Sequence, residues 1–472
     1  MGHVIPVLEL GKRLLTHHNF TVTIFVVSSH TTTPSPEYSQ LLTSFSTTAA
    51  TSDHLCNIVD VPPANISALV PATAAVVTMI AVTMRETKPA LRSAIFAAER
   101  RPTVLIVDLF GSDLLDIADE LGIPKLVFIA SNAWFLSLTV YIPVLDEVVR
   151  GEYVDQTKPL GIPGCKPVRP DQVVDPMLDR TDQQYQEYLR IGVQIPKADG
   201  VLVNTWEEAE PASLAALRDE NLLGRFAKAS VYPIGPFTRP VVDSSGPVFD
   251  WLDQQPVESV IFVSFGSGGT LSCEQMTEVA WGLELSQQRF VWVVRPPTLA
   301  TGDAAFFARG TGDDPSGYLP EGFLTRTRDS GRAEILGHRS VGGFWSHCGW
   351  NSTLESVTNG VPMIAWPLYA EQKMNAAVVA EELGVGVRPK AAPTKEVVGR
   401  EEVEKLVRAI MAETLGFGIR SRVKELKISA ERALAEGGSS YNALSLVAKG
   451  LCEVGRNDGV SVAKSNTIDG GF

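Results

Sequence analysis

One stretch in the last third of the chain, residues 346–372, brings together residue types that suit a phosphorylated ligand. Gly349 has no Cβ and so permits a tight turn with close backbone approach to a ligand. Asn351 and Ser352 then provide short polar side chains suited to the start of a helix, which we expect to end at Gly360. A helix start directs unpaired N–H groups and a partial positive charge at its surroundings. The stretch therefore favours binding of a diphosphate.

A purely structural interpretation of the same helix start remains open. Ser352 and Glu355 also match the capping box, in which a serine accepts from an N–H of the first turn and a glutamate reaches back. Capping does not require the run 347–350 that precedes them, nor the acid and amide side chains of Glu371 and Gln372. Carboxylate and amide groups can bond the hydroxyls of a sugar. The whole run therefore favours a nucleotide-sugar ligand.

These motifs resemble those of a known family. Residues 333–376 are similar to most of the plant secondary product glycosyltransferase box, the signature of plant UDP-dependent glycosyltransferases. The similarity extends over nearly the whole chain, and residues 107–113 and 263–275 most resemble the hydroquinone glucosyltransferase branch. The resemblance implies an α/β protein of the GT-B type, with two Rossmann-like, doubly wound parallel-sheet domains facing a cleft. It also implies inverting transfer of glucose from UDP-glucose to a hydroxyl of a small phenolic or lipophilic acceptor.

The resemblance assigns donor contacts residue by residue. They are Ser267, His347, Asn351 and Ser352 for the diphosphate, Glu355 for the ribose hydroxyls, and Trp350, Glu371 and Gln372 for the sugar. Ser267 lies in the glycine-rich segment 264–270, which lacks the spacing of a dinucleotide fingerprint and the lysine of a P-loop. A plain strand-to-helix turn is the alternative there. Trp366, within the box, is expected to pack rather than to bind.

The resemblance also supplies a catalytic pair, His3 and Asp108. A histidine, with a pKa of about 6.5, can remove the proton of a phenol, with a pKa of about 10, as attack proceeds. A carboxylate on the second ring nitrogen fixes the tautomer and stabilises the imidazolium. Asp108 follows the apolar run 104–107, and ligands bind at the carboxyl ends of strands in open α/β sheets. Without the resemblance, a histidine this close to a chain end would be interpreted as inert.

The acceptor site is less readable than the donor site. Phe110, Trp134 and Phe135 suggest stacking surfaces for a small hydroxylated aromatic acceptor, with core packing as an equal alternative. No acidic cluster has the spacing of a divalent-metal site. We therefore expect no metal and no cofactor, with UDP-glucose as the donor co-substrate.

Short apolar runs that are rich in β-branched residues indicate the elements that position these groups. They are 22–27, 104–107, 126–129, 201–203, 260–263 and 290–294. Continuous runs suit parallel strands buried on both faces, and the segments 6–15 and 274–285 between them have helical spacing. The alternation predicts doubly wound sheets. The predicted organisation is an acceptor domain at 1–238, a linker at 239–256, a donor domain at 257–455 and a frayed tail at 456–472.

Composition fits a two-domain enzyme that works on small molecules. The 472 residues exceed what one core usually serves, and a net charge of −13 argues against nucleic acid and anionic membranes as partners. Five scattered cysteines predict a reducing, cytoplasmic setting. The uncharged segment 66–84 is long enough to cross a bilayer, but Pro71 and several hydroxyl residues favour a buried helix instead. We expect a monomer with no membrane span.

Two segments of the family pattern are missing from this sequence. The pattern has an apolar strand ahead of the Gly-His motif, which here stands at residues 2–3, and a Trp-Ala-Pro-Gln start to the box, which would fall between Arg332 and Ala333. The missing tryptophan stacks on uracil, a contact worth about 1 to 3 kcal/mol, and Trp345 is not expected to replace it. An impaired relative that binds UDP without turnover is therefore one alternative. A GT-B nucleotide-sugar epimerase is another, which the box disfavours.

Overall fold

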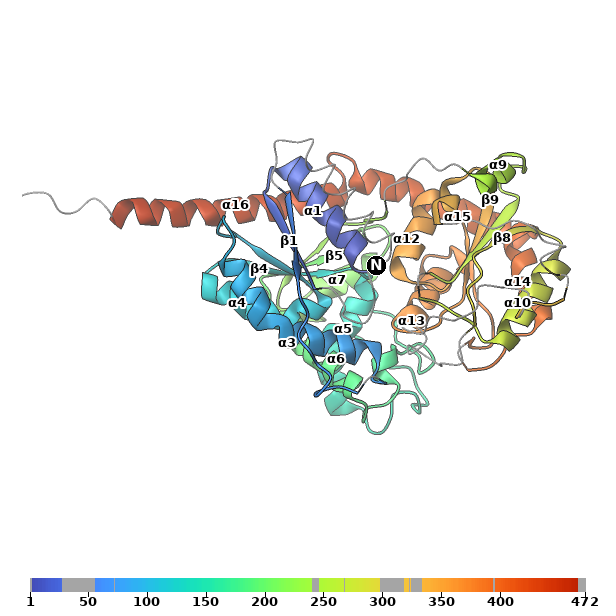
Figure 1. Cartoon of the computed structure of the whole chain (residues 1–472), viewed down its shortest axis with the longest axis horizontal. Helices are drawn as coiled ribbons and strands as arrows, with labels where there is room; N and C mark the ends of the chain where they lie inside the picture. Colours follow the sequence, from blue (N-terminus) through green and yellow to red (C-terminus); the bar gives the residue numbers. More distant parts are fainter. Residues whose placement is uncertain are drawn as a thin grey trace, which may run out of the picture.

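The computed structural model describes most of the chain. The described residues are 2–27, 56–71, 73–239, 246–266, 268–297, 318–321, 323, 333–393 and 395–465, with side chains up to Glu453 except 333–334. Figure 1 shows two α/β bodies side by side, with the start of the chain at the boundary between them.

The first body alternates strands and helices. Its elements are α1 (Val4–His18), β1 (Val22–Val27), β2 (Cys56–Val61), α3 (Val76–Phe96), β3 (Leu105–Asp108), η1 (Leu109–Leu114), α4 (Leu115–Leu121), β4 (Lys125–Ile129), α5 (Ala133–Val148), η2 (Asp175–Met177), α6 (Gln183–Gln194), η3 (Ile195–Lys197), β5 (Gly200–Val203), α7 (Pro211–Arg218), α8 (Gly224–Ala227) and β6 (Ser230–Pro233).

The second body repeats the alternation. Its elements are α9 (Pro247–Asp253), β7 (Val260–Ser264), α10 (Cys273–Ser286), β8 (Arg289–Trp292), η6 (Ala333–Gly337), β9 (Val341–Ser346), α12 (Trp350–Asn359), β10 (Met363–Ala365), α13 (Gln372–Ala377), the π-helix η7 (Val378–Glu382), β11 (Gly386–Val387), α14 (Arg400–Met411) and α15 (Thr414–Leu434), followed by α16 (Ser439–Ser465).

All described strands of both domains pair in parallel. The second domain has a five-stranded sheet in the order β11-β10-β9-β7-β8. The first has a four-stranded sheet, β3-β4-β5-β6, and a separate pair, β1-β2. Each of the six apolar runs forms a strand, because continuous apolar residues suit strands covered on both faces. The predicted α/β, GT-B architecture is confirmed.

The sheet of the first domain is in two pieces. A doubly wound sheet in the order 3-2-1-4-5-6 would have a strand between β1 and β3. Among the described residues no strand joins them. β1 and β3 are mostly only half-buried, whereas every residue of β5 is buried. The two strands beside this gap therefore lack the cover that the central strands have.

The end of the chain returns to the first domain. Leu444 and Val447 of α16 lie in one hydrophobic cluster with Leu10 and Leu14 of α1. The Ser440 hydroxyl also donates to the Gly235 carbonyl at 2.5 Å. Residues of α16 that lie within the donor domain predicted at 257–455 thus pack on the first domain. The tail predicted to fray from 456 is helical to 465, and 466–472 lie outside the described residues.

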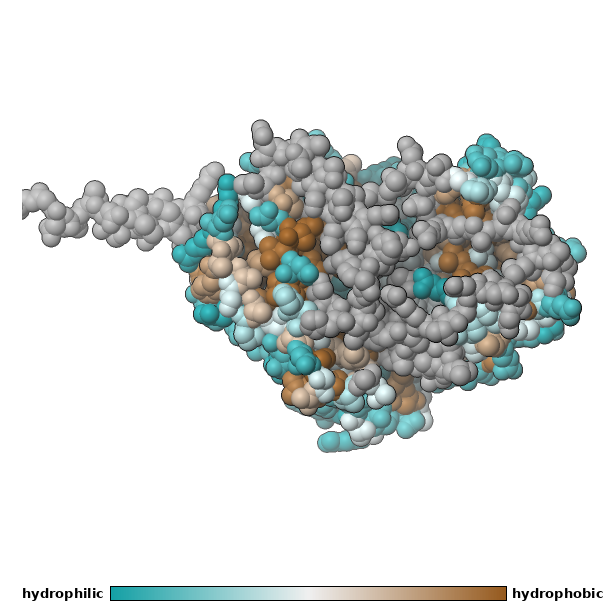
Figure 2. All heavy atoms as spheres, in the orientation of Figure 1, coloured by the Kyte–Doolittle hydropathy of each residue, from teal (hydrophilic) through white to brown (hydrophobic). Residues whose placement is uncertain are grey.

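The segment that was long enough to cross a membrane, residues 66–84, does not form one helix. Its first residues form turns, and α3 begins at Val76 and continues through charged residues such as Arg85 and Lys88. Among the described residues, no helix has both the length and the apolar character to span a bilayer. On the face in Figure 2, hydrophobic side chains gather in patches on both bodies, with hydrophilic side chains beside them.

Candidate active site

The predicted catalytic pair is assembled at the start of the chain. His3 occupies the N-cap position of α1, and Asp108 ends β3. His3 Nδ1 lies 3.1 Å from Asp108 Oδ2. Asp108 Oδ1 also accepts the Gly111 N–H at 2.9 Å, which fixes the plane of the carboxylate. Because an ionised carboxylate only accepts, Nδ1 of His3 must donate, and Nε2 is left as the basic nitrogen.

The surroundings of His3 leave its side chain partly exposed. The His3 side chain is 41% exposed. One side of the imidazole faces the Phe110 ring, with 5.2 Å between ring centroids. Phe110 is thus the predicted acceptor residue that lies beside the base, where an aromatic acceptor would have to bring its hydroxyl.

Trp134 and Phe135 lie elsewhere. Trp134 is 2% exposed, and its indole N–H donates to the Lys166 carbonyl at 3.0 Å. Phe135 is buried in the same cluster, with its ring 6.3 Å from that of Tyr188. This geometry favours the packing alternative for both residues. Their position follows from α5, which is apolar almost all round and therefore buried.

The predicted phosphate-binding helix exists and faces the start of the chain. α12 ends as expected, with Gly360 in the left-handed region at φ 73°. The Asn351 side-chain amide donates to the Gly2 carbonyl at 2.8 Å, so α12 of one domain adjoins the residue before His3 of the other. Asn351 Oδ1 is buried and has no hydrogen-bond partner among the described residues. The candidate diphosphate site and the base are therefore neighbours.

The capping-box alternative does not hold. α12 begins at Trp350 with Gly349 as N-cap, and no side chain caps it. Ser352 consequently lies in the first turn instead of preceding it. The N-cap lies two residues before Asn351 and three before Ser352, because glycine, which is accepted at an N-cap, stands directly before the helix. The first turn keeps its N–H groups free of side-chain caps, as an anion site requires.

His347 is held between two glycines. A Cβ on Gly266 would lie 2.5 Å from its Cε1, and a Cβ on Gly349 would lie 2.6 Å from its Nε2. Only residues without a side chain fit there. Burial, and secondarily the charge of Arg295, lowers the pKa of His347 to about 4. Without a ligand His347 is therefore a neutral hydrogen-bonding group at pH 7, while Ser267, predicted beside it, lies outside the described residues.

The residues predicted to bind ribose and sugar differ in how far their side chains are already hydrogen-bonded within the protein. Burial raises the pKa of Glu355 to about 7, opposed by the charge of Arg239. Gln372 accepts two backbone N–H groups of residues 368–369 through Oε1, at 2.9 and 3.1 Å. The Trp350 indole N–H donates to the Asn204 carbonyl at 2.8 Å across the domain boundary. The Trp350 side chain is therefore engaged in domain packing, which leaves its backbone for a ligand.

Two asparagines that sequence reasoning missed connect this region to the first domain. Asn375 Nδ2 donates to the Cys348 carbonyl at 2.9 Å and to Glu371 Oε1 at 3.2 Å. Its Oδ1 accepts from Asn132 Nδ2 at 2.6 Å. Asn132 follows β4 and caps α5 by accepting the Phe135 N–H. The only sequence signal was the position of Asn132 after a predicted strand.

Two tryptophans of the box region form core. Trp345 and Trp366 are fully buried, and their rings meet edge to face with centroids 5.0 Å apart. Packing was the prediction for Trp366, and it is confirmed. Trp345 is equally enclosed, so it offers no face to a uracil base.

Comparison with known proteins agrees with this geometry. Residues 247–411 match the family described as UDP-glucoronosyl and UDP-glucosyl transferase. Anthocyanidin 3-O-glucosyltransferase 5 of Manihot esculenta is 59% identical, over 94% of this chain and 92% of that protein. The chain belongs to this family. It is therefore a UDP-dependent glycosyltransferase.

Other members of the family support the same placement. Hydroquinone glucosyltransferase of Rauvolfia serpentina is 42% identical, over 95% of each chain. The solved structure of Phytolacca americana UGT2, complexed with UDP-2fluoro-glucose and pterostilbene, has a TM-score of 0.82 and 37% identity. It covers 96% of this chain and 97% of its own. The predicted family is thus confirmed from both sequence and fold.

Proposed function

We propose that this glycosyltransferase moves glucose from UDP-glucose to a hydroxyl of a small phenolic acceptor, with inversion at the anomeric carbon. The observation that carries the proposal is the His3–Asp108 pair, which adjoins the uncapped start of α12 through the contact between Gly2 and Asn351. The named relatives support it, since they include glucosyltransferases of an anthocyanidin and of hydroquinone. The pterostilbene complex of UGT2 supports a phenolic acceptor.

His3 acts on the acceptor. As the phenolic oxygen attacks the anomeric carbon, its proton passes to His3 Nε2. The imidazolium that forms is stabilised by Asp108, whose carboxylate is already bonded to Nδ1. Attack from the face opposite the diphosphate inverts the configuration. Proximity and orientation supply much of the rate, which is why the Asp108–Gly111 bond that fixes the carboxylate matters.

The donor site stabilises the leaving group. When the bond between the anomeric carbon and the phosphate oxygen breaks, the electron pair goes to UDP. The N–H groups of the first turn of α12, which no side chain caps, and the Ser352 hydroxyl would stabilise the developing charge. His347 enters as a neutral N–H donor. Glu371 and Gln372 would hold the sugar hydroxyls, and Glu355 the ribose.

The setting of the reaction belongs to the same proposal. We place it in the cytoplasm, supported by five cysteines that are all free thiols. We expect a monomer that uses no metal and no cofactor. The donor-site N–H groups would stabilise the negative charge of the diphosphate in place of a metal ion.

A panel of phenols tests the proposal. The full chain is incubated with UDP-glucose and each phenol in excess chelator, and the products are identified by mass spectrometry. We expect a product heavier than the phenol by one hexose residue, at the same rate with and without chelator. Release of free glucose alone, conversion of the sugar without an acceptor, or loss of product in chelator would overturn it.

A further inference from the structure

A buried aspartate of the first domain is hydrogen-bonded to the turn that precedes the predicted sugar contacts. Asp175, at the start of η2, is 7% exposed. Its Oδ2 accepts the Ala370 N–H at 2.7 Å, and its own N–H donates to the Ala370 carbonyl at 3.1 Å. Its Oδ1 bonds Lys373 Nζ at 2.9 Å. Asp175 therefore satisfies both backbone groups of one residue and neutralises the charge of another, all in the opposite domain.

Ala370, to which Asp175 is bonded, has an unfavourable backbone conformation. Ala370 has φ 58°, in the left-handed region, which costs a residue with a Cβ about 1 to 2 kcal/mol. It directly precedes Glu371 and Gln372. A conformation of this kind persists only where its surroundings determine it. Here Gln372 Oε1 holds the turn from within its own domain, and Asp175 holds it from the other.

We propose that Asp175 is a positioning residue for the sugar subsite, which sets Glu371 and Gln372 for the hexose only while the two domains are docked. This inference rests on the proposed function, because it takes Glu371 and Gln372 as the sugar contacts. Its consequence is specific. The nucleotide, held by α12 and His347, does not depend on the Ala370 turn, whereas the hexose does.

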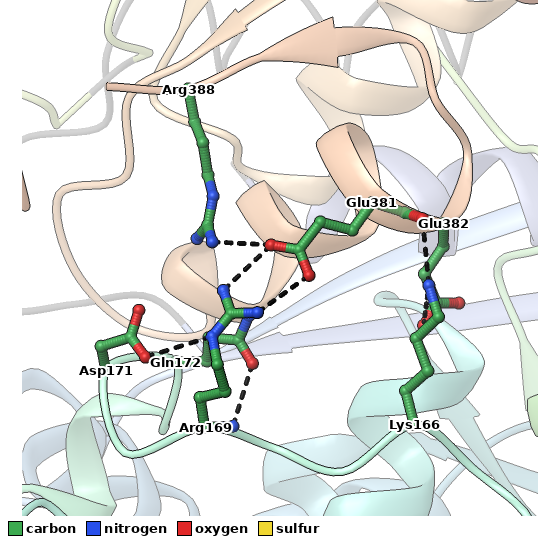
Figure 3. A network of polar contacts seen from close by, with 7 residues as sticks. All are labelled: Lys166, Arg169, Asp171, Gln172, Glu381, Glu382 and Arg388. Carbon is green, nitrogen blue, oxygen red and sulfur yellow. Dashed lines mark hydrogen bonds and ion pairs between the residues drawn. The ribbon is translucent and has the colours of Figure 1, made fainter. Parts of the chain in front are cut away.

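A second polar contact across the same boundary provides a matched control. Arg169 forms a bidentate ion pair with Glu381, at 2.9 and 3.0 Å, and Glu381 also pairs with Arg388 (Figure 3). Lys166 donates to the Glu381 carbonyl at 3.0 Å in the same network. These groups dock the same loop of the first domain but do not touch the Ala370 turn. Arg169→Met therefore weakens the contact between the domains without removing any hydrogen bond of the Ala370 turn.

The test compares UDP with UDP-glucose by titration calorimetry, without acceptor. We expect Asp175→Ala to weaken UDP-glucose binding about tenfold or more, because the bonds to Ala370 and Lys373 are lost, with UDP affinity kept within about twofold. Asp175→Asn keeps an oxygen for the Ala370 N–H but loses the ion pair with Lys373, and should weaken UDP-glucose binding about threefold with UDP affinity unchanged. Arg169→Met should leave the ratio of the two affinities unchanged.

Two results would overturn the assignment. One is an equal loss of UDP and UDP-glucose affinity in Asp175→Ala, which would make the aspartate a docking residue only. The other is unchanged binding of both ligands. Thermal unfolding of each variant checks that the chain is folded, and Asp175→Asn keeps the test informative if the alanine variant is not. Failure of the wild-type chain to bind UDP-glucose would instead contradict the proposed function.

Discussion

The donor and acceptor sides of this enzyme hold their key histidines by different means. His347 is 9% exposed and lies between two glycines at the end of a central strand of a continuous five-stranded sheet. The His3 side chain is 41% exposed, stands at the N-cap of α1, and depends on Asp108 at the edge of a sheet in two pieces. The donor side is fixed by packing. The His3 ring is held by its hydrogen bond to Asp108 and by its contact with Phe110, while the residue before it is bonded to Asn351 of the other domain.

Removal of the base should have the largest effect. Replacing His3 by alanine should lower kcat by roughly 10² to 10⁴, because within the described part of the chain no other proton acceptor is bonded to Asp108. UDP affinity should change little, since His3 does not belong to the donor side. Steady-state kinetics and calorimetry on the same variant measure both. Full activity in the variant would show that another base is used.

A Trp-Ala-Pro-Gln segment should sharpen the contrast between the two sides by strengthening the donor side alone. Inserted between Arg332 and Ala333, it should lower the KM for UDP-glucose by roughly ten- to a hundredfold, through stacking on uracil. The value of kcat should change little, since the base lies in the other domain and serves a different step. Steady-state kinetics of the native chain and the extended variant measure both constants, and an equal KM would refute this.

The diphosphate site should respond less steeply. Replacing His347 and Ser352 together by alanine removes two neutral donors, which should weaken UDP binding by about 2 kcal/mol, or roughly thirtyfold. A larger loss is not expected, because His347, neutral at pH 7 without a ligand, places no cationic charge beside the diphosphate. Calorimetry with UDP measures the loss. Unchanged affinity would remove α12 and His347 from the donor site.

The free energy of unfolding should fall below neutral pH because His347 is buried in its neutral form. Its pKa is lowered to about 4 in the folded chain, so protonation between about pH 6.5 and pH 4 favours the unfolded state. His347 therefore contributes stability above pH ~6.5 that is lost as the pH falls. Denaturant unfolding at pH 7 and pH 5 should show a decrease of about 1 to 2 kcal/mol that is absent in His347→Gln. Parallel curves for both proteins would contradict the burial.

The sequence predicted what local patterns can carry. The strands, α10, the end of α12 and the packing of Trp366 follow from apolar runs, spacing and a terminal glycine. The His3–Asp108 pair came from the family resemblance, and the structure joins it across 105 positions. Contacts between domains could not be predicted. Asp175 and Ala370 are 195 positions apart, and nothing local marks their pairing. The packing of α16 on the first domain could not be predicted either, because the spacing of its apolar residues does not indicate which domain they contact.

The configuration of the first product tests the proposed mechanism most sharply. In this mechanism His3 of one domain and the diphosphate site of the other act on opposite faces of one anomeric carbon. Proton NMR of the glucoside, recorded during turnover with UDP-glucose and a phenol, gives the coupling constant of the anomeric proton and hence the configuration. We expect a β-glucoside from the α-linked donor, formed by the wild-type chain and lost in His3→Ala. An α-glucoside, or a β-glucoside formed as fast without His3, would contradict it.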